Sequence, residues 1–290
     1  MALVPNFNRI INLHFLSASD SPTIINDIVC PLSGRKPNIE INGQLSTENN
    51  LHALNIKVKN LYLENLSQQY GNIRVIAGYK NQPKIAMTGS IMSIYPETPG
   101  PEGTTIIQCV SGKFENWLDK YINLNLDAGF TLQQAILLIT NAIGLDTPDI
   151  DLNIGAKTSP VSLQIQDKAA FVIPELKKLF PNVEIVTQSN KICAWANNLP
   201  SLKLAQELKF LSAPPQLVAG NGNNCMAWIT APWDPSLKPG DKIKIDQRTF
   251  SLKNALAVPK DSGEYIINTI DFHFSTVGKI NQMTILAGAL

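Results

Sequence analysis

Apolar and polar residues alternate with a period of two in several short segments of the first 110 residues. In the first of them, Ile11, Leu13 and Phe15 are separated by Asn12 and His14. Because successive side chains of a β-strand point to opposite faces, each segment is expected to bury one face. No long helical pattern interrupts the series, which is typical of an antiparallel sandwich or barrel. The predicted strands cover residues 11–15, 39–41, 54–58, 73–79, 85–94 and 104–110.

The middle third of the chain changes to helical spacing and predicts a small α+β module. Thr131 and Gln134 are spaced as a capping box, in which the hydroxyl accepts from the third amide and the glutamine side chain reaches back. Gly144 supplies the C-terminal stop of the same helix. Between these ends, one apolar stripe recurs at helical intervals: Leu132, Ala135, Ile136, Ile139 and Ile143.

Two further helical segments are predicted in this module. Trp117 and Tyr121 belong to a helix-like apolar spacing within residues 114–126. Asp167 could cap a short helix, but Pro174 in its interior would cost a hydrogen bond, so the second helical turn is expected to begin at Pro174 and to cover residues 175–180.

Strand patterns surround these helices and return after them. The longest covers residues 265–274, where Asn268 interrupts an apolar face that includes Ile266 and Phe272. Gly89, in the fifth of the earlier strands, predicts a bulge or a bend. The other predicted strands cover residues 161–165, 183–187 with 192–196 as a hairpin, 225–230, 242–245, 248–252 and 280–286.

The chain carries little charge. Charged residues make up only 16% of it, although 44% of its residues are hydrophobic; soluble domains commonly have roughly a quarter of charged residues. Neutral polar residues, Asn above all, take the place of the missing charges. A surface with so little self-repulsion suits a subunit embedded in an assembly better than a free enzyme. The formal net charge is +1 and the basic residues are scattered, which argues against a stripe that binds nucleic acid.

Cysteine usage and hydropathy predict a reduced protein without a membrane anchor. No apolar run is long enough to cross a bilayer, and the first residues lack a signal-peptide pattern. The cysteines form no Cys-x-x-Cys pair and are expected to be buried thiols: Cys30, Cys109, Cys193 and Cys225.

No catalytic, cofactor-binding or metal site is predicted. His14, His52 and His273 are isolated from one another, and no zinc-ligand spacing exists. We expect His14 and His52 on the polar faces of their strands, as surface or interface residues. The sequence contains no phosphate-binding glycine loop, nucleophile elbow or zinc-protease motif. Gly220 and Gly222 precede no helix pattern and are expected in a loop.

Two small sets of residues leave other functions open. Asp149 and Asp151 are carboxylates in a proline-bearing loop, and glycosidases use two carboxyl groups across a cleft. Trp228 and Trp233 are aromatic residues that could form a carbohydrate platform. A tryptophan before Asp-Pro at a strand exit is, however, more often a packing anchor.

Several segments resemble the baseplate hub proteins of contractile-tailed bacteriophages. Residues 232–241, with the sequence PWDPSLKPGD, form the most distinctive of these segments. The resemblance covers most of the chain and consists of short segments with structural roles rather than catalytic motifs. The other matching segments are residues 34–37, 75–79, 89–91, 99–105, 107–109, 265–267, 272–278 and 281–284.

The resemblance implies a mainly β fold with an α+β insert, in which two tube-forming β-barrel domains flank a small α+β domain. The corresponding boundaries are residues 1–112, 113–200 and 201–290. In that family, three subunits form a ring of six barrels between a six-fold tail tube and a three-fold spike. The expected partners are two further copies in a homotrimer, the tail tube protein, the central spike protein and other baseplate proteins. Genomic DNA is expected only as cargo that passes through the lumen.

The leading hypothesis is therefore a structural virion protein without enzymatic activity or cofactor, a hub of the tail baseplate that is assembled in the bacterial cytoplasm. An infectious phage and a phage-derived contractile injection machine would both use such a hub. Two alternatives stay open, namely a tail-associated enzyme that degrades the cell wall and a module that binds carbohydrate or a receptor.

Overall fold

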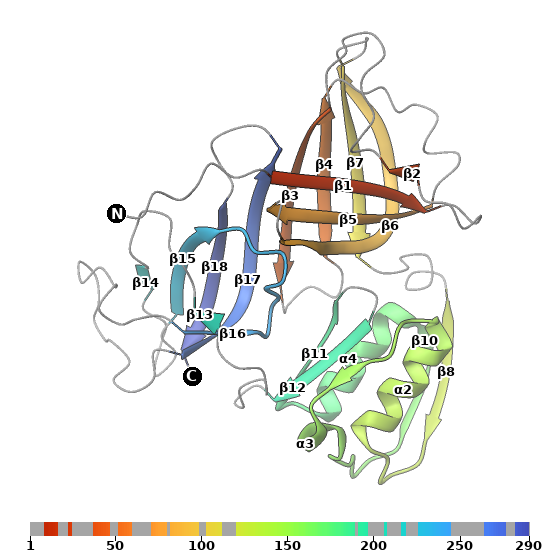
Figure 1. Ribbon diagram of the computed structural model, residues 1–290. Helices are drawn as coiled ribbons and strands as arrows, with labels where there is room; N and C mark the ends of the chain where they lie inside the picture. Colours follow the sequence, from red (N-terminus) through yellow and green to blue (C-terminus); the bar gives the residue numbers. More distant parts are fainter. Residues whose placement is uncertain are drawn as a thin grey trace.

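The structure is a computed structural model that describes residues 9–16, 23–24, 37–46, 52–59, 71–79, 82–98, 103–111, 120–188, 191–196, 206–207, 216–218, 226–244, 264–276 and 282–289. Figure 1 shows two β-rich parts side by side and, below them, a smaller part that holds the helices. The chain is mainly β with a small α+β insert, which confirms the fold class predicted from the sequence.

All six strands predicted near the N-terminus are present, and each pairs antiparallel with its neighbours. Their inward residues alternate with more exposed ones, as in β1, where Ile11, Leu13 and Phe15 are buried. The strands are β1 (Arg9–Leu16), the short β2 (Thr23–Ile24), β3 (Asn38–Ser46), β4 (Ala53–Lys59), β5 (Asn72–Tyr79), β6 (Gln82–Thr98) and β7 (Thr104–Ser111).

Strand β6 turns from one layer of this part into the other. Its first half pairs with β5 and its second half with β7, and register shifts occur on the β5 side and, after Ile91, on the β7 side. Such shifts bend a strand. Gly89 lies between the two shifts, and a Cβ atom there would lie 1.9 Å from the carbonyl oxygen of Val110. The glycine at which we predicted a bulge or bend therefore permits a close approach of two strands.

The bend places β1 and β5 across β3, β4 and β7, as Figure 1 shows. The two layers enclose an apolar core. Phe15 and Val75 from one layer and Ile41 and Ile56 from the other are fully buried in it.

The C-terminal strands extend the same sheet. Strand β17 (Glu264–Ser275) pairs with β18 (Gln282–Ala289) on one side and with β3 on the other. Beyond β18 lie β15 (Met226–Pro232) and β14 (Gln216–Val218), while β16 (Lys242–Lys244) and β13 (Gln206–Glu207) branch from β17. Among the described residues, 13 strands form one sheet, whose main path runs β14-β15-β18-β17-β3-β4-β7-β6-β5-β1-β2.

This path has two ends, so the described strands do not show the closure of a barrel. One apolar core serves both β-rich parts, since Ile41 and Ile56 belong to the same cluster as Ile229 and Ile285. The domain boundaries near residues 112 and 201 stay a prediction.

A bulge in β17 changes the face that we predicted. Asn268 is the extra residue, because the register with β18 shifts between its two neighbours. The prediction that Ile266 belongs to the buried face is wrong, because the bulge reverses the alternation. The buried residues are Tyr265 and Ile267 before the bulge, and Ile270, Phe272 and Phe274 after it.

The insert combines two small sheets with helices around a second apolar core. Strand β8 (Tyr121–Leu126) pairs with β10 (Leu163–Lys168). The predicted hairpin is confirmed by β11 (Val183–Gln188) and β12 (Lys191–Ala196), and β9 (Asp149–Ile150) pairs parallel to β12. The helices are α2 (Leu132–Ile143), α3 (Leu152–Gly155) and α4 (Ala169–Leu179).

Helix α2 has the predicted ends. The backbone N–H of Gln134 donates to the Thr131 hydroxyl at 3.2 Å, and the backbone N–H of Thr131 donates to Gln134 Oε1 at 2.8 Å. Gly144 ends the helix in the left-handed region, with φ 74°. The whole predicted apolar stripe is buried.

Two helix predictions in the insert are wrong. Residues 121–126 form the strand β8, because Ile122 and Leu124 face the core while Asn123 and Asn125 alternate with them; residues 114–119 lie outside the described residues. Helix α4 does not begin at Pro174 but contains it. Pro174 lies on the exposed side of the helix, where solvent can bind the carbonyl group that its missing N–H leaves unpaired.

Candidate functional site

One face of the large sheet is largely polar over seven successive strands, from β15 to β6 in the pairing order. The opposite face of these strands forms the core. The pairing registers place seven outward residues in one row across the sheet, and nearly all of them are uncharged. The row consists of Pro232, Gln282, His273, Asn42, Asn55, Gln108 and Ser93.

The polar face carries few charged side chains, and some of them have a partner nearby. Lys57 Nζ lies 2.9 Å from Glu97 Oε1, and His273 Nε2 lies 3.5 Å from Glu40 Oε1. The other ring nitrogen of His273, Nδ1, contacts the side-chain oxygen of Asn42. The face therefore presents mainly uncharged amide and hydroxyl groups.

A shallow groove of about 440 Å³ lies in the middle of the polar face. It follows β3, β17 and β18 where the N-terminal and C-terminal parts meet. Its lining offers hydrogen-bond donors and acceptors but no cluster of nucleophiles or metal ligands. The lining residues are Asn42, Gly43, Gln44, Asp271, Phe272, His273, Gln282 and Thr284.

The segment 232–241, here called the arm, crosses from β15 to β16 and contacts several parts of the chain. Trp233 is 2% exposed. Its ring stacks on Phe272 with a centroid distance of 4.8 Å and packs against Phe274 at 4.7 Å. Phe274 in turn meets Tyr79 of β5 edge to face at 5.9 Å. Trp233 is thus a packing anchor, as predicted for a tryptophan in this sequence context.

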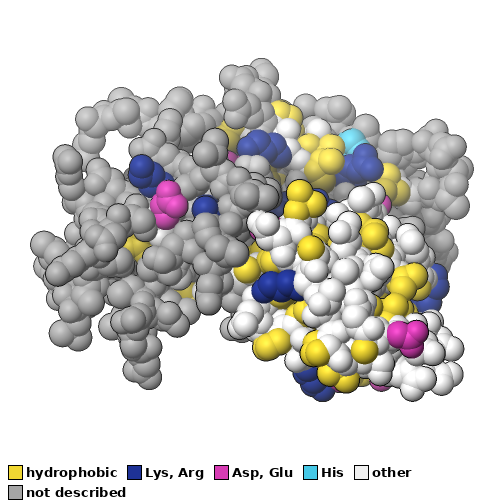
Figure 2. Space-filling model, turned by 90° about the horizontal axis from the view of Figure 1, so that it is seen from below, with side chains coloured by type: hydrophobic (Ala, Val, Ile, Leu, Met, Phe, Trp, Pro, Cys, Tyr) yellow, Lys and Arg dark blue, Asp and Glu magenta, His cyan; other side chains and the backbone are white. Residues whose placement is uncertain are grey.

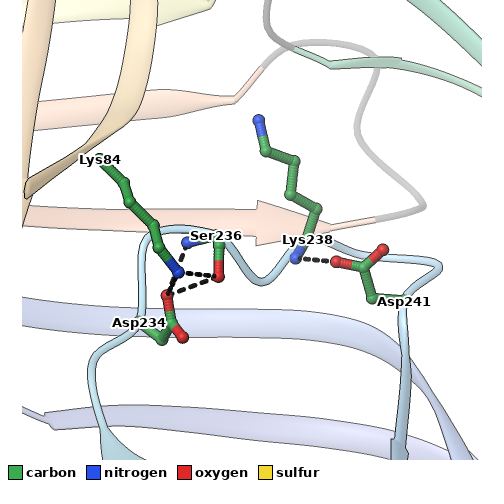
Figure 3. Close-up of polar contacts among 5 residues, drawn as sticks. All are labelled: Lys84, Asp234, Ser236, Lys238 and Asp241. Carbon is green, nitrogen blue, oxygen red and sulfur yellow. Dashed lines mark hydrogen bonds and ion pairs between the residues drawn. The ribbon is translucent and has the colours of Figure 1, made fainter. Parts of the chain in front are cut away.

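A polar latch joins the arm to β6 (Figure 3). Lys84 Nζ lies 3.2 Å from Asp234 Oδ1 and 2.8 Å from Ser236 Oγ. Asp234 Oδ1 also accepts from the backbone N–H of Ser236 at 2.9 Å and from its hydroxyl at 2.6 Å. Burial alone would raise the pKa of Asp234, but the hydrogen bonds from Ser236 and Lys84 outweigh it and lower this pKa. The carboxylate therefore stays ionised while it holds the two parts together.

The far end of the arm rests on the insert. Gly240 has φ +90°, and a Cβ atom there would lie 2.7 Å from Cζ2 of Trp195. The backbone N–H of Gly240 donates to the Ile267 carbonyl at 2.7 Å, and the N–H of Lys238 donates to Asp241 Oδ2 at 2.9 Å. Figure 3 shows the Lys238 side chain pointing away from Asp241. The arm thus contacts both β-rich parts and the insert.

His52 is buried, so its prediction as a surface or interface residue is wrong. It is 4% exposed. The reason is its spacing, because His52 lies two residues before Leu54 and therefore shares the inward face of β4. Its Nε2 lies 3.2 Å from the Ser46 carbonyl oxygen, and its backbone bonds to Ser111. His14 lies on the partly exposed face of β1, as predicted.

The two carboxylates considered for catalysis have structural roles. Asp149 pairs with Lys191, with a Nζ–Oδ2 distance of 3.1 Å. Asp151 caps α3 by accepting from the backbone N–H of Asn153 at 2.9 Å. The two tryptophans do not form a platform either, since Trp233 is buried and Trp228 is exposed on the sheet face.

The cysteines in the described segments are buried thiols, as predicted. Burial raises the pKa of the Cys109 thiol to about 12, and Cys193 is likewise buried. Cys30 and Cys225, like the loop with Gly220 and Gly222, lie outside the described residues. Within the described ranges, no group of three or more His, Cys, Asp or Glu residues could hold a metal ion, and no helix is long and apolar enough to cross a membrane.

The surface of the insert agrees with the low charge of the sequence. In Figure 2, this part shows mostly uncharged and hydrophobic surface, with scattered Lys, Arg, Asp and Glu side chains. Two residues that form the joints, Lys84 and Trp195, were not singled out in the sequence, whereas Gly240 belongs to the segment 232–241. The partners lie far apart in the chain, and no local pattern marks such contacts.

Comparison with solved structures gives several proteins of the same fold. The 43 kDa tail protein of prophage MuSo2 from Shewanella oneidensis matches with a TM-score of 0.59 and 10% identity, over 97% of either chain. An E. coli component of the type VI secretion system, described as similar to the T4 bacteriophage tail proteins gp27 and gp5, matches with a TM-score of 0.56 and 11% identity, over 87% of this chain and 72% of that one.

A tail protein from Neisseria meningitidis MC58 also matches, with a TM-score of 0.56 and 8% identity, over 98% of this chain and 97% of that one. No protein-family profile matches the sequence, and no curated protein matches it either. The chain therefore has the fold of phage tail proteins, and the resemblance to baseplate hub proteins is confirmed at the level of the fold.

Proposed function

We propose that the protein is a structural subunit of a phage tail or a related injection machine, the hub of its baseplate. In this proposal, three copies form a ring in which the two β-rich parts of each subunit supply six similar units. Such a ring joins a six-fold tail tube to a three-fold spike. The role depends on shape and symmetry and needs no catalytic group.

The continuous sheet supports this proposal most directly. The N-terminal and C-terminal parts are joined edge to edge by β3 and β17, so seven strands from β15 to β6 share one largely polar face. A sheet that is apolar on one face and polar on the other can line a water-filled channel while its core lies outside. Three such sheets, side by side, would form the wall of a channel with strands from six similar parts.

The chemistry of the polar face fits passage rather than binding. Phosphate recognition requires clustered Lys and Arg, whereas the described outward residues of this face include two lysines, Lys57 and Lys59, and Lys57 is paired with Glu97. Genomic DNA would therefore pass this wall as cargo without being held. The central row of amides offers hydrogen bonds to water and hydrates the wall.

The arm gives the subunit the rigidity that a hub requires. It links β6 through Lys84, the C-terminal strands through Trp233 and the insert through Gly240. A load applied to one part would then be transmitted to the others. The insert would keep a fixed orientation with respect to the ring.

The relatives support an association with a spike. One is described as similar to gp27 and gp5 of T4. A further structure with this fold, a PdpA–VgrG complex from Francisella, matches with a TM-score of 0.50 and 10% identity, over 97% of this chain and 52% of that one. The proposed partners are two further copies, the spike, the tube protein and other baseplate proteins, and the proposed location is the tail of the particle.

Light scattering coupled to size-exclusion chromatography tests the proposal. The purified chain, alone and with its spike protein, should reach three times its mass of 31.8 kDa. A persistent monomer that does not bind the spike would contradict it. An enzymatic function would instead be shown by turnover of peptidoglycan that Asp149→Asn or Asp151→Asn abolishes, and we expect no such turnover.

A further inference from the structure

Large apolar side chains are exposed at both lateral ends of the polar face. Outside the insert, the described part of the chain exposes four such residues, Ile85, Met92, Tyr95 and Trp228. Three of them lie at the ends of the seven-strand face, and the middle of the face carries amides. Met92 and Tyr95 are near one another on one strand, and exposed apolar patches with a polar rim often mark contact surfaces.

Trp228 marks the end formed by β15. Its side chain is 44% exposed. It shares a row with Leu286 of β18 and Thr269 of β17 on the outward face. Only β14, which pairs with the first three residues of β15, lies further out among the described strands. A large aromatic ring therefore stands near the edge of the sheet with much of its surface in water.

Met92 and Tyr95 mark the opposite end, on the second half of β6. Their side chains are 46% and 40% exposed. Gln108 Nε2 lies 3.5 Å from the Tyr95 hydroxyl, which places the tyrosine on the polar face. Met92 is the extra residue where the register with β7 shifts. No described strand pairs with the outer edge of β6 from Met92 onward.

We propose that these two ends meet between neighbouring copies, so that Trp228 of one subunit packs against Met92 and Tyr95 of the next. The inference rests on the proposed ring and names its lateral contact. The two ends differ, so the contact is head to tail, and a head-to-tail contact that closes gives a ring. Tryptophan and tyrosine are typical anchors of interfaces, and methionine packs well on aromatic rings.

The offset between the ends agrees with a closed ring. The row of Trp228 reaches Ser46 on β3, whereas the row of Tyr95 reaches Ser275 on β17, several residues further along the strands. Sheets that close have tilted strands, and tilted strands meet with a stagger between their edges. The amide groove then lies at the middle of each subunit, away from the contact.

The first test compares Trp228→Ala with Phe171→Ala, which removes an aromatic ring of similar exposure from the insert. A dilution series by light scattering should show that Trp228→Ala weakens assembly by about 30-fold or more, the usual effect of truncating an interface anchor. Phe171→Ala should assemble like the wild type. Thermal unfolding of both variants should match the wild type at concentrations at which the wild type is monomeric, because both side chains are exposed and assembly then adds nothing to stability.

The second test is a cross-link between copies. Cys30 and Cys225 are replaced by serine in all variants, since Cys109 and Cys193 are buried. A short bismaleimide should join Trp228→Cys protein to Tyr95→Cys protein only when the two are mixed. Either variant alone should stay uncross-linked, because a head-to-tail contact does not bring like residues together.

The outcomes separate this inference from the proposed function. If the wild type assembles while Trp228→Ala assembles equally well and the mixture gives no cross-link, the lateral contact is wrong and the hub proposal stands. If the wild type stays monomeric at every concentration and with the spike, both are overturned. Cross-linking of Trp228→Cys protein to itself would show a two-fold contact and would also overturn the inference.

Discussion

Acidification should destabilise this protein through one buried residue, His52. Its pKa is lowered from 6.5 to about 4, chiefly because burial penalises the charged ring; the bond to the Ser46 carbonyl opposes this shift, and Lys238 adds to it. Between these two pH values the unfolded chain binds a proton at His52 that the folded chain does not. The free energy of unfolding therefore falls as the pH drops from 6.5 towards 4. Well above pH 6.5 His52 is neutral in both states and no longer changes the free energy of unfolding.

The size of the effect follows from the shift. Each pKa unit corresponds to about 1.4 kcal/mol, so the full loss is about 3 kcal/mol, of which about 2 kcal/mol falls between pH 7 and pH 5. Urea unfolding at a series of pH values, followed by tryptophan fluorescence, measures it. The comparison with His52→Gln is decisive, because the carboxylates titrate in both proteins and cancel in the difference.

We expect the stability of the wild type to fall more steeply below pH 6.5 than that of His52→Gln. His14→Gln serves as a matched control, since His14 lies on a partly exposed face and should leave most of the slope in place. Equal slopes for the wild type and His52→Gln would refute the conclusion that a neutral, buried imidazole is built into this part of the core.

Three further predictions concern the arm. Trp233→Ala should lower the free energy of unfolding by about 3–5 kcal/mol in urea, because it empties a buried aromatic cluster; a change below 1 kcal/mol would contradict the anchor role. Gly240→Ala should loosen the contact between the arm and the insert, because the new methyl group collides with Trp195 and the backbone has φ +90°. Hydrogen exchange should then rise around Trp195. Unchanged exchange would contradict the proposed contact between Gly240 and Trp195. Lys84→Met should cost at most about 1 kcal/mol, as expected for a partly exposed ion pair, whereas Asp234→Ala should cost more because it also leaves Ser236 without its acceptor.

Local rules predicted much of this fold. The alternation in β1, β3, β4 and β5 is set by which side chains reach the core, so a period of two suffices to locate these strands. The capping box at Thr131 and the left-handed Gly144 are also local, because each needs only neighbours within one helical turn.

Other features depend on context that no short window contains. The apolar spacing of Tyr121–Leu126 is compatible with a helix, but the segment is a strand because it pairs with β10. Helix α4 tolerates Pro174 because its exposed side faces water. His52 shows a different kind of error, since its spacing from Leu54 already placed it inward, and the rule that histidine is polar prevailed over the alternation.

The candidate functional surfaces were the least predictable part. The polar face arises only when β17 pairs with β3, which brings Asn42 beside His273, 231 positions away. The latch between Lys84 and Asp234 likewise spans 150 positions. The resemblance of residues 232–241 to hub proteins identified the arm as characteristic, but its contacts with β6 and Trp195 follow from the tertiary structure alone.

Negative-stain electron microscopy of the purified chain tests the central claim most directly. Class averages should show a ring with three-fold symmetry, six lobes around its rim and an open channel at its centre. Monomeric particles, two-fold particles or a closed disc without a channel would contradict the proposal that this protein is the hub of a tail.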